Sequence, residues 1–250
     1  MRSPVLVLSG VGLTAAVTHR VIRALQPSFS VIQLPGVPAP EDALASLDAA
    51  GVEQAHVVGV SFGASVAQEI AIGHPGRVRS LVLGSATAGG DLYSPPEPAV
   101  REFVRRLGEL PAEEGLWASV PYLYAASTCR RRAPLIGEDI AERLREPPDP
   151  RAYGRQLVVA RRHDTAARLS EIAAPTLVIH GKEDRLLPVE NGRRLARAIA
   201  RARFVPLRGA AHAFPTDVPG VDRELVSFLL EHSPLRRGSP ARRTGPAARA

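Results

Sequence analysis

Short runs of apolar, often β-branched residues alternate along the chain with longer segments in which apolar residues recur at helical spacing. This alternation is typical of parallel strands joined by helical crossovers. The predicted strands are residues 5–8, 30–34, 56–60, 80–83, 176–180 and 203–206. The predicted helices between them are residues 16–25, 42–50, 62–73, 190–200 and 222–232. The pattern predicts an α/β protein with a mostly parallel sheet of about six strands and helices on both faces.

The alternation stops between residues 88 and 169, where nine prolines surround helical pieces at residues 99–110, 113–119, 134–145 and 152–161. This segment lies just before the penultimate predicted strand. We expect it to form a helical cap over the carboxyl ends of the strands, where open α/β sheets bind ligands. The alternative is a second packed subdomain without a catalytic part. The remaining core would comprise residues 1–87 and 170–233.

The net charge of +7 is concentrated at the end of the chain. Residues 234–250 hold five arginines and no acid, and without them the net charge falls to +2. This tail is rich in Arg, Pro, Gly and Ala, and we expect it to be disordered. The body is therefore not typical of a nucleic-acid binder.

The single cysteine, Cys129, excludes an internal disulfide and a multi-cysteine metal site. No run of about 18 uninterrupted apolar residues occurs, so the sequence predicts no membrane-spanning helix. The apolar run near the start is broken by Ser9, Gly10 and Gly12, which makes it too short for an export signal. The sequence favours a cytoplasmic protein that has no cofactor and no metal.

The pattern Gly-x-Ser-x-Gly at residues 59–63 places Ser61 between an apolar strand and a helical segment. A strand-to-helix turn this tight forces its central residue into strained geometry and lifts the side chain clear of the sheet. Glycines on both sides allow neighbouring backbone to approach closely. The turn predicts a nucleophilic serine. The alternative is a serine that only caps the helix.

A serine hydroxyl is a weak nucleophile until a base takes its proton and an acid holds that base in the correct tautomer. Of seven histidines, His212 follows a predicted strand in a loop, where such a base belongs. The other six fit packing or capping roles better: His19, His56, His74, His163, His180 and His232. For the acid, the loop after residues 176–180 offers Asp184, with Glu183 as a local alternative and Asp91 as a distant one.

The chain order Ser61, Asp184, His212 resembles that of the α/β-hydrolase superfamily over nearly all of residues 4–232. The most specific stretches are residues 56–63 (HVVGVSFG), 74–83 (HPGRVRSLVL) and 174–184 (APTLVIHGKED). The middle stretch is similar to small esterase, enol-lactonase and polyester-depolymerase branches. The resemblance implies a Ser-His-Asp triad and an oxyanion hole formed by the backbone N–H groups of Val11 and Phe62.

The chain departs from the superfamily near its start. Ser9-Gly10 stands where most relatives carry His-Gly, so a side chain that normally braces the oxyanion loop is missing. The usual N-terminal antiparallel hairpin has no room before Val5, and the run after Leu34 is shortened. We expect these changes to leave the triad positions intact and to widen the pocket.

These observations predict a carboxylic-ester hydrolase that cleaves an ester or lactone of a small molecule through an acyl-enzyme on Ser61. Trp117, Tyr122 and Tyr124 are candidates for an apolar acyl pocket, or equally for the core of the cap. The alternatives are a biosynthetic enzyme of the same fold, performing acyl transfer, cyclisation or elimination, and a small-molecule binder without turnover. Neither nucleic acid nor a membrane is an expected partner. The sequence does not indicate the oligomeric state.

Overall fold

A six-stranded sheet forms the centre of the molecule in the computed structural model, which describes residues 2–11, 18–34, 38–145 and 150–234, without the side chains of 150–153. The strands are β1 (Pro4–Leu8), β2 (Ser30–Gln33), β3 (Ala55–Val60), β4 (Val78–Gly84), β5 (Thr176–Gly181) and β6 (Ala202–Leu207). Their order is β2-β1-β3-β4-β5-β6, and every neighbouring pair is parallel. The predicted six-stranded sheet is confirmed.

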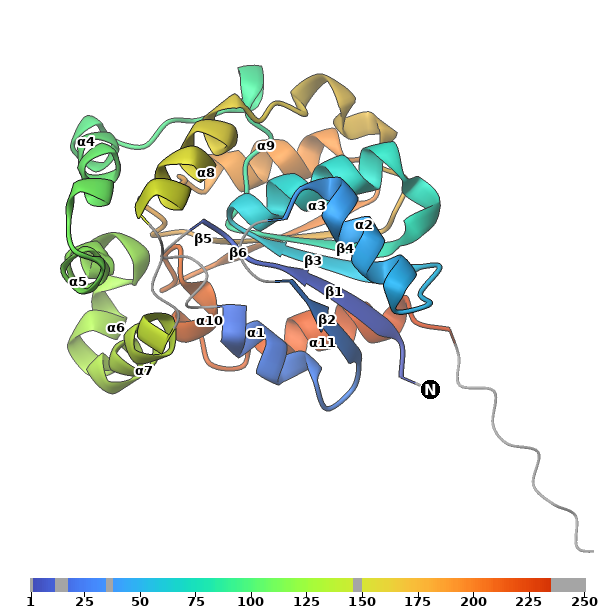
Figure 1. Cartoon of the computed structure of the whole chain (residues 1–250), viewed down its shortest axis with the longest axis horizontal. Helices are drawn as coiled ribbons and strands as arrows, with labels where there is room; N and C mark the ends of the chain where they lie inside the picture. Colours follow the sequence, from blue (N-terminus) through green and yellow to red (C-terminus); the bar gives the residue numbers. More distant parts are fainter. Residues whose placement is uncertain (1, 12–17, 35–37, 146–149, 235–250) are drawn as a thin grey trace, which may run out of the picture.

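Strand residues alternate between the two faces of the sheet, and each face has its own apolar core. Leu6 and Leu8 of β1 pack with helices α2 (Pro40–Ala49), α3 (Phe62–Gly73) and α9 (Glu190–Ala198). Val5 and Val7 pack with helices α1 (Thr18–Leu25) and α11 (Val221–Glu231) on the opposite face. Figure 1 shows these helices above and below the sheet. The prediction of helices on both faces is confirmed.

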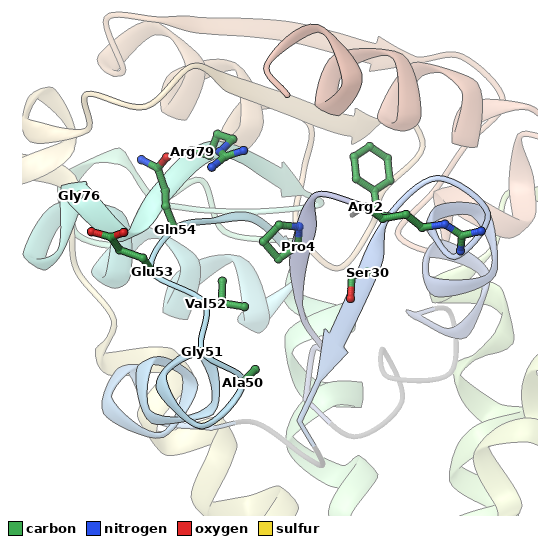
Figure 2. Close-up of a pocket in the computed structure, with 11 residues that line it drawn as sticks. Arg2, Pro4, Ser30, Ala50, Gly51, Val52, Glu53, Gln54, Gly76 and Arg79 are labelled. Carbon is green, nitrogen blue, oxygen red and sulfur yellow. Dashed lines mark hydrogen bonds between the residues drawn. The ribbon is translucent and has the colours of Figure 1, made fainter. Parts of the chain in front are cut away.

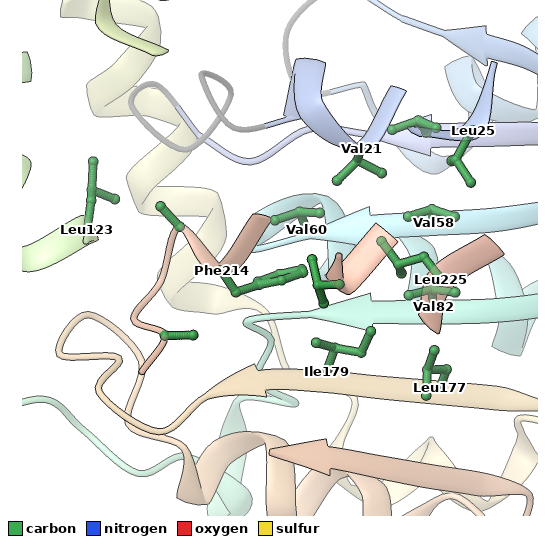
Figure 3. Close-up of a cluster of buried hydrophobic side chains, with 14 of the residues drawn as sticks. Val21, Leu25, Val58, Val60, Val82, Leu123, Leu177, Ile179, Phe214 and Leu225 are labelled. Carbon is green, nitrogen blue, oxygen red and sulfur yellow. The ribbon is translucent and has the colours of Figure 1, made fainter. Parts of the chain in front are cut away.

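The core on the α1 and α11 face is continuous from the sheet centre to its carboxyl edge (Figure 3). Val58, Val82 and Leu177 lie side by side on β3, β4 and β5 beneath Leu225 of α11. Phe214, in the short helix α10 (Phe214–Asp217), lies at the strand ends, in the same cluster as Leu123. The apolar packing of this face therefore extends to the strand ends, where the candidate catalytic loops lie.

Five helices lie between β4 and β5 in the sequence and cluster on the side to which the strand arrows point (Figure 1). They are α4 (Pro98–Arg106), α5 (Ala112–Leu123), α6 (Ala126–Arg131), α7 (Ala133–Arg145) and α8 (Pro150–Arg162). Short 3-10 helices occur at Pro75–Arg77, Gly90–Leu92, Leu107–Glu109 and Ala166–Glu171. The predicted helical segment before the penultimate strand is therefore present.

A buried carboxylate joins this helical segment to the rest of the molecule. Asp139 of α7 accepts hydrogen bonds from Arg20 of α1 at 2.7 Å, from the Tyr124 hydroxyl at 3.1 Å and from Thr216 of α10 at 2.6 Å. If one of these partners were lost, the buried charge of Asp139 would be poorly compensated. The contacts therefore stabilise the placement of α7 against α1 and α10.

Some predictions concern residues that the structure does not describe. These are the first two residues of the predicted helix 16–25, the shortened run at 35–37 and the tail at 235–250. Among the helices that the structure does describe, none is long and apolar enough to cross a membrane.

Candidate active site

Ser61 occupies the turn between β3 and α3 in a backbone conformation that side chains rarely adopt, with φ 56° and ψ −123°. Its N–H donates to the carbonyl of Gly84 at the end of β4, at 2.8 Å. A Cβ atom at Gly59 would lie 2.5 Å from the Gly63 carbonyl oxygen, and one at Gly63 would lie 2.2 Å from that of Leu8. Both glycines are therefore required by close backbone contacts, and they hold Ser61 in its strained position.

His212 lies in the loop between β6 and α10 and is almost fully buried. The hydroxyl of Ser85 donates to the His212 carbonyl at 3.1 Å. Ser85, which follows β4, also has a positive φ of 45°. The sequence reasoning missed Ser85, because nothing in its neighbourhood distinguishes it from an ordinary loop serine. With this backbone conformation, the Ser85 hydroxyl reaches the loop that carries His212 and donates to it.

Asp217 also holds this loop, and it too was missed. Its carboxylate accepts from the N–H of Ala211, just before His212, at 2.7 Å, and from the N–H of Ala125 at 3.1 Å. Burial raises the pKa of Asp217, while these hydrogen bonds oppose the rise. The signal that could have found it is an acidic residue five positions after His212 in an otherwise apolar segment.

Asp184 is the carboxylate that contacts His212. Its Oδ2 lies 2.8 Å from Nδ1 of His212, while its Oδ1 accepts from the N–H groups of Leu186 and Leu187 at 3.0 and 2.9 Å. Burial acts to raise the pKa of Asp184, but the adjacent charge of His212 and the hydrogen bonds from His180 and His212 outweigh it. The pKa of Asp184 is thus well below its usual range. The acid therefore remains ionised beside His212.

The two alternative acids, Glu183 and Asp91, are both exposed. The described hydrogen bonds and ion pairs join His212 to Asp184 and to neither alternative. The structure therefore favours Asp184 over both.

A second imidazole, His180 at the end of β5, contacts the same carboxylate. Its Nε2 lies 3.3 Å from Oδ2 of Asp184 and 2.7 Å from the carbonyl oxygen of Leu187. A carbonyl only accepts, so Nε2 carries the proton. The sequence reasoning assigned His180 to packing because it lies in an apolar strand. The fully buried ring also makes this polar contact.

Ser61 and His212 line the same cavity, which has a volume of about 590 Å³. Nε2 of His212 has no hydrogen-bond partner among the described residues, so the two side chains are not yet hydrogen-bonded. Such bonds are often long before substrate binds and tighten in the reactive complex. The arrangement thus offers the Ser61 hydroxyl, the His212 imidazole with Nε2 free to accept a proton, and the buried Asp184 carboxylate that contacts Nδ1 of this imidazole.

Val11 and Phe62, the two residues expected to supply oxyanion donors, also line this cavity. Phe62 is the first residue of α3, where backbone N–H groups lack partners within the helix. Such a helix start favours a developing negative charge.

The described lining of this cavity includes none of Trp117, Tyr122 and Tyr124, so the structure does not support their use as an acyl pocket. Trp117 is 52% exposed on α5. Tyr122 stacks on Phe103, a lining residue, at 4.2 Å between ring centroids. Tyr124 is buried and bonded to Asp139, as a core residue. Helical pattern alone does not show which side of a helix meets a cavity.

Of the remaining histidines, His163 also lines the cavity. Burial lowers the pKa of His163 to about 4, so the ring is neutral near pH 7. His56 lies in the core, 2.7 Å from Ser80 and 3.0 Å from Ser233. The packing role expected for His56 agrees with these contacts.

A larger hollow of about 910 Å³ lies at the amino-terminal ends of the strands (Figure 2). Its lining includes Arg2, Ser30, Gln54 and Arg79, without a serine and histidine together. Arg2 bonds the Gln26 carbonyl and Arg79 bonds Gln54, so both guanidiniums have partners. The grouping of Ser61, His212 and Asp184 makes the smaller cavity the candidate active site.

In the part of the chain that the structure describes, no group of three or more His, Cys, Asp or Glu side chains is placed to hold a metal ion. The chemistry that this arrangement itself offers is nucleophilic attack with a proton transfer between Ser61 and His212.

Comparison with known proteins identifies relatives over most of the chain. A protein of Azorhizobium caulinodans that bears the name carbamate hydrolase RutD is 31% identical over 189 residues, which cover 72% of this chain and 67% of that protein. A poly(3-hydroxyalkanoate) depolymerase of Ectopseudomonas oleovorans is 30% identical over 217 residues, which cover 81% of this chain and 75% of that protein.

Among solved structures, a thermophilic esterase from Thermogutta terrifontis superimposes with a TM-score of 0.72 at 26% identity, covering 92% of this chain and 90% of that one. The sequence profile of the Alpha/beta hydrolase family matches residues 5–222. With the fold, the strand-to-helix turn at Ser61 and these relatives in agreement, the chain belongs to the alpha/beta hydrolase family.

Proposed function

We propose that this protein hydrolyses a carboxylic ester or lactone of a small molecule through an acyl-enzyme on Ser61. Membership of a hydrolase family and relatives named as hydrolases support the hydrolytic class. The observation that carries the proposal is the pairing of His212 with the buried Asp184 at the edge of the cavity that Ser61 lines.

In the proposed reaction, Nε2 of His212 takes the proton of the Ser61 hydroxyl as Oγ attacks the substrate carbonyl. The protonated imidazole then gives this proton to the leaving alcohol, and the acyl group stays on Ser61. In the second half, His212 takes a proton from water as the oxygen of that water attacks the acyl carbonyl. His212 then returns this proton to Oγ of Ser61 as the bond between Oγ and the acyl carbon breaks, and the acid product leaves. Asp184 holds Nδ1 of His212 protonated, so that Nε2 is the atom that accepts the proton.

The tetrahedral intermediates carry a negative oxygen, for which we propose the N–H groups of Val11 and Phe62 as donors. Loss of one such donor costs about 3 kcal/mol of transition-state stabilisation in other hydrolases. Both donors belong to the backbone, so the replacement of a bracing histidine by Ser9 does not remove either of them.

We further propose that the helices between β4 and β5 act as a cap that determines the substrate. The cavity wall includes side chains from α4, α5 and α8, whereas Ser61, Asp184 and His212 follow strands β3, β5 and β6. The partner is then a small molecule enclosed between these helices and the strand ends. The lone cysteine makes a cytoplasmic location the simplest expectation.

A fluorophosphonate probe tests the nucleophile. We expect covalent labelling of Ser61, mapped by peptide mass spectrometry, with no label on Ser65, a second serine that lines the same cavity. Ser61→Ala should fold normally, escape labelling and lose turnover of 4-nitrophenyl esters. Full esterase activity in Ser61→Ala would refute the proposal.

Carbamate hydrolysis is the second candidate, because the relative from Azorhizobium caulinodans bears that name. A carbamate carbonyl is attacked by the same nucleophile but is less electrophilic than an ester carbonyl. Matched 4-nitrophenyl esters and carbamates, measured with wild type and Ser61→Ala, separate the two. A higher kcat/KM for the carbamate would favour this candidate.

A further inference from the structure

The wall of the Ser61 cavity is mainly apolar, with Leu107, Leu157 and Leu186 among its members. It also includes two arginines, Arg101 of α4 and Arg161 of α8. No Asp or Glu is among the described lining residues. Among the described lining residues, the permanently charged side chains are therefore all positive.

The two guanidiniums have no ion-pair or hydrogen-bond partner among the described residues, although both helices carry other arginines. Arg105, on the same helix as Arg101, pairs with Glu102 at 2.6 Å. The free pair on the cavity wall therefore leaves its positive charge available to a bound molecule.

Both guanidiniums lie close enough to one side chain to affect it. Tyr93, which also lines the cavity, has its pKa raised by burial, and the charges of Arg101 and Arg161 both oppose that rise. Arg101 and Arg161 are far apart in sequence but act on the same hydroxyl. Both guanidiniums therefore lie near the same lining residue of the cavity.

His163 does not add to this charge near pH 7. Its ring lines the cavity, but burial keeps it neutral down to about pH 4. Tyr93 is neutral as well, because its pKa is raised. The two arginines therefore set the charge of this part of the wall.

We propose that the preferred substrate is an ester whose acyl chain ends in a carboxylate, which Arg101 and Arg161 bind while the scissile carbonyl lies at Ser61. This inference rests on the proposed ester hydrolysis and adds a substrate class to it. The apolar wall suits the methylene chain, and two guanidiniums suit a planar carboxylate, which accepts from their N–H groups.

The test compares pairs of 4-nitrophenyl esters that have the same shape and differ in charge. Half-esters of adipate, pimelate and suberate are matched with acyl chains in which an isopropyl group replaces the carboxylate. We expect wild type to show a kcat/KM about tenfold higher for the anionic member of at least one pair. In Arg101→Gln/Arg161→Gln this ratio should fall to about one, and high salt should reduce it in wild type.

Arg162→Gln is the matched control. Arg162 is exposed on α8 beside Arg161, but it is not among the lining residues. Its removal takes away a positive charge of the same helix without touching the cavity, so the wild-type ratio should be kept. An equal loss in Arg162→Gln would mean that net charge alone, and not this site, selects the substrate.

Binding to Ser61→Ala, measured by calorimetry, separates this inference from the proposed function. A tighter Kd for an anionic ester than for its neutral partner, lost on replacing both arginines, supports the inference even if no ester is turned over. Equal Kd values for all three pairs, or a preference that survives the double replacement, would overturn it. Ser61-dependent hydrolysis without such a preference would leave the esterase proposal standing alone.

Discussion

Nε2 of His180 lies 3.3 Å from Oδ2 of Asp184, the same oxygen that lies 2.8 Å from Nδ1 of His212. One carboxylate oxygen thus contacts two imidazoles, while the other accepts two backbone N–H groups. The position of Asp184 is therefore determined from several directions. His180 contributes one of these contacts and does not line the cavity among its described residues.

Replacing His180 by Phe keeps an aromatic ring but removes the N–H that faces Asp184. We expect kcat to fall about tenfold, because a charge-assisted hydrogen bond of about 1.5 kcal/mol is lost. The pKa of Asp184 should rise, because the hydrogen bond from His180 is one of the contacts that lower it, and the acidic limb of the kcat/KM profile should move to higher pH. His180→Gln, whose amide N–H can reach a similar position, should restore both. A purely structural role would lower the free energy of unfolding in both variants and leave the pH profile unchanged.

The positive φ of Ser61 predicts a gain in stability when its side chain is removed entirely. Ser61→Gly and Ser61→Ala both lack the hydroxyl, but only glycine adopts this φ without strain. We expect the Gly variant to exceed the Ala variant by about 1 kcal/mol in free energy of unfolding, measured in urea. An Ala variant of equal or greater stability would show that the turn is not strained.

Gly63 should tolerate no side chain. Its Cβ would lie 2.2 Å from the Leu8 carbonyl oxygen, and both contacting segments are backbone that cannot move without shifting β1. We expect Gly63→Ala to cost more than about 3 kcal/mol in free energy of unfolding or to prevent folding. Gly73→Ala in the same helix has nothing within 4 Å of its Cβ and should be neutral or slightly stabilising. Thermal unfolding of both variants provides the comparison.

The buried His56 predicts a loss of stability in mild acid. Burial, helped by the nearby charges of Arg79 and His232, lowers the pKa of His56 from 6.5 to about 4. Between these two pH values the unfolded chain binds more protons than the folded chain, so the free energy of unfolding falls as pH falls. The loss from this group approaches about 3 kcal/mol near pH 4.

His56→Gln should weaken this pH dependence, as measured by urea unfolding between pH 7 and pH 4. His74→Gln removes an exposed histidine and is the control, which should retain the dependence. A slope that is the same in all three proteins would assign the acid sensitivity to other groups.

The strands could be predicted to within about two residues, because buried strands are short apolar runs with a strong local signal. The predicted strand at residues 56–60, for example, corresponds to β3 at Ala55–Val60. Ser61, Asp184 and His212 could be singled out for a related reason. Each follows a strand, and the carboxyl ends of parallel strands meet at one edge of the sheet.

Residues that depend on how helices pack could not be predicted. The helical piece predicted at 113–119 continues to Leu123 through Pro121, since packing holds the helix together past the proline. Trp117 and Tyr122 are not among the described lining residues of the cavity, whereas Arg101 and Arg161 are, and the helical periodicity of the sequence does not show which of these side chains the packing brings to the wall. Ser85 and Asp217 act through contacts with residues far along the chain, which local patterns do not contain.

The candidate nucleophile, base and acid follow strands, whereas both free arginines of the cavity belong to helices encoded by one uninterrupted stretch between β4 and β5. A chimera that exchanges only this stretch with a relative would change most of the described cavity wall and none of the candidate reacting groups. Substrate preference in this fold can therefore evolve by local replacement of coding sequence, at little risk to the rate of bond cleavage.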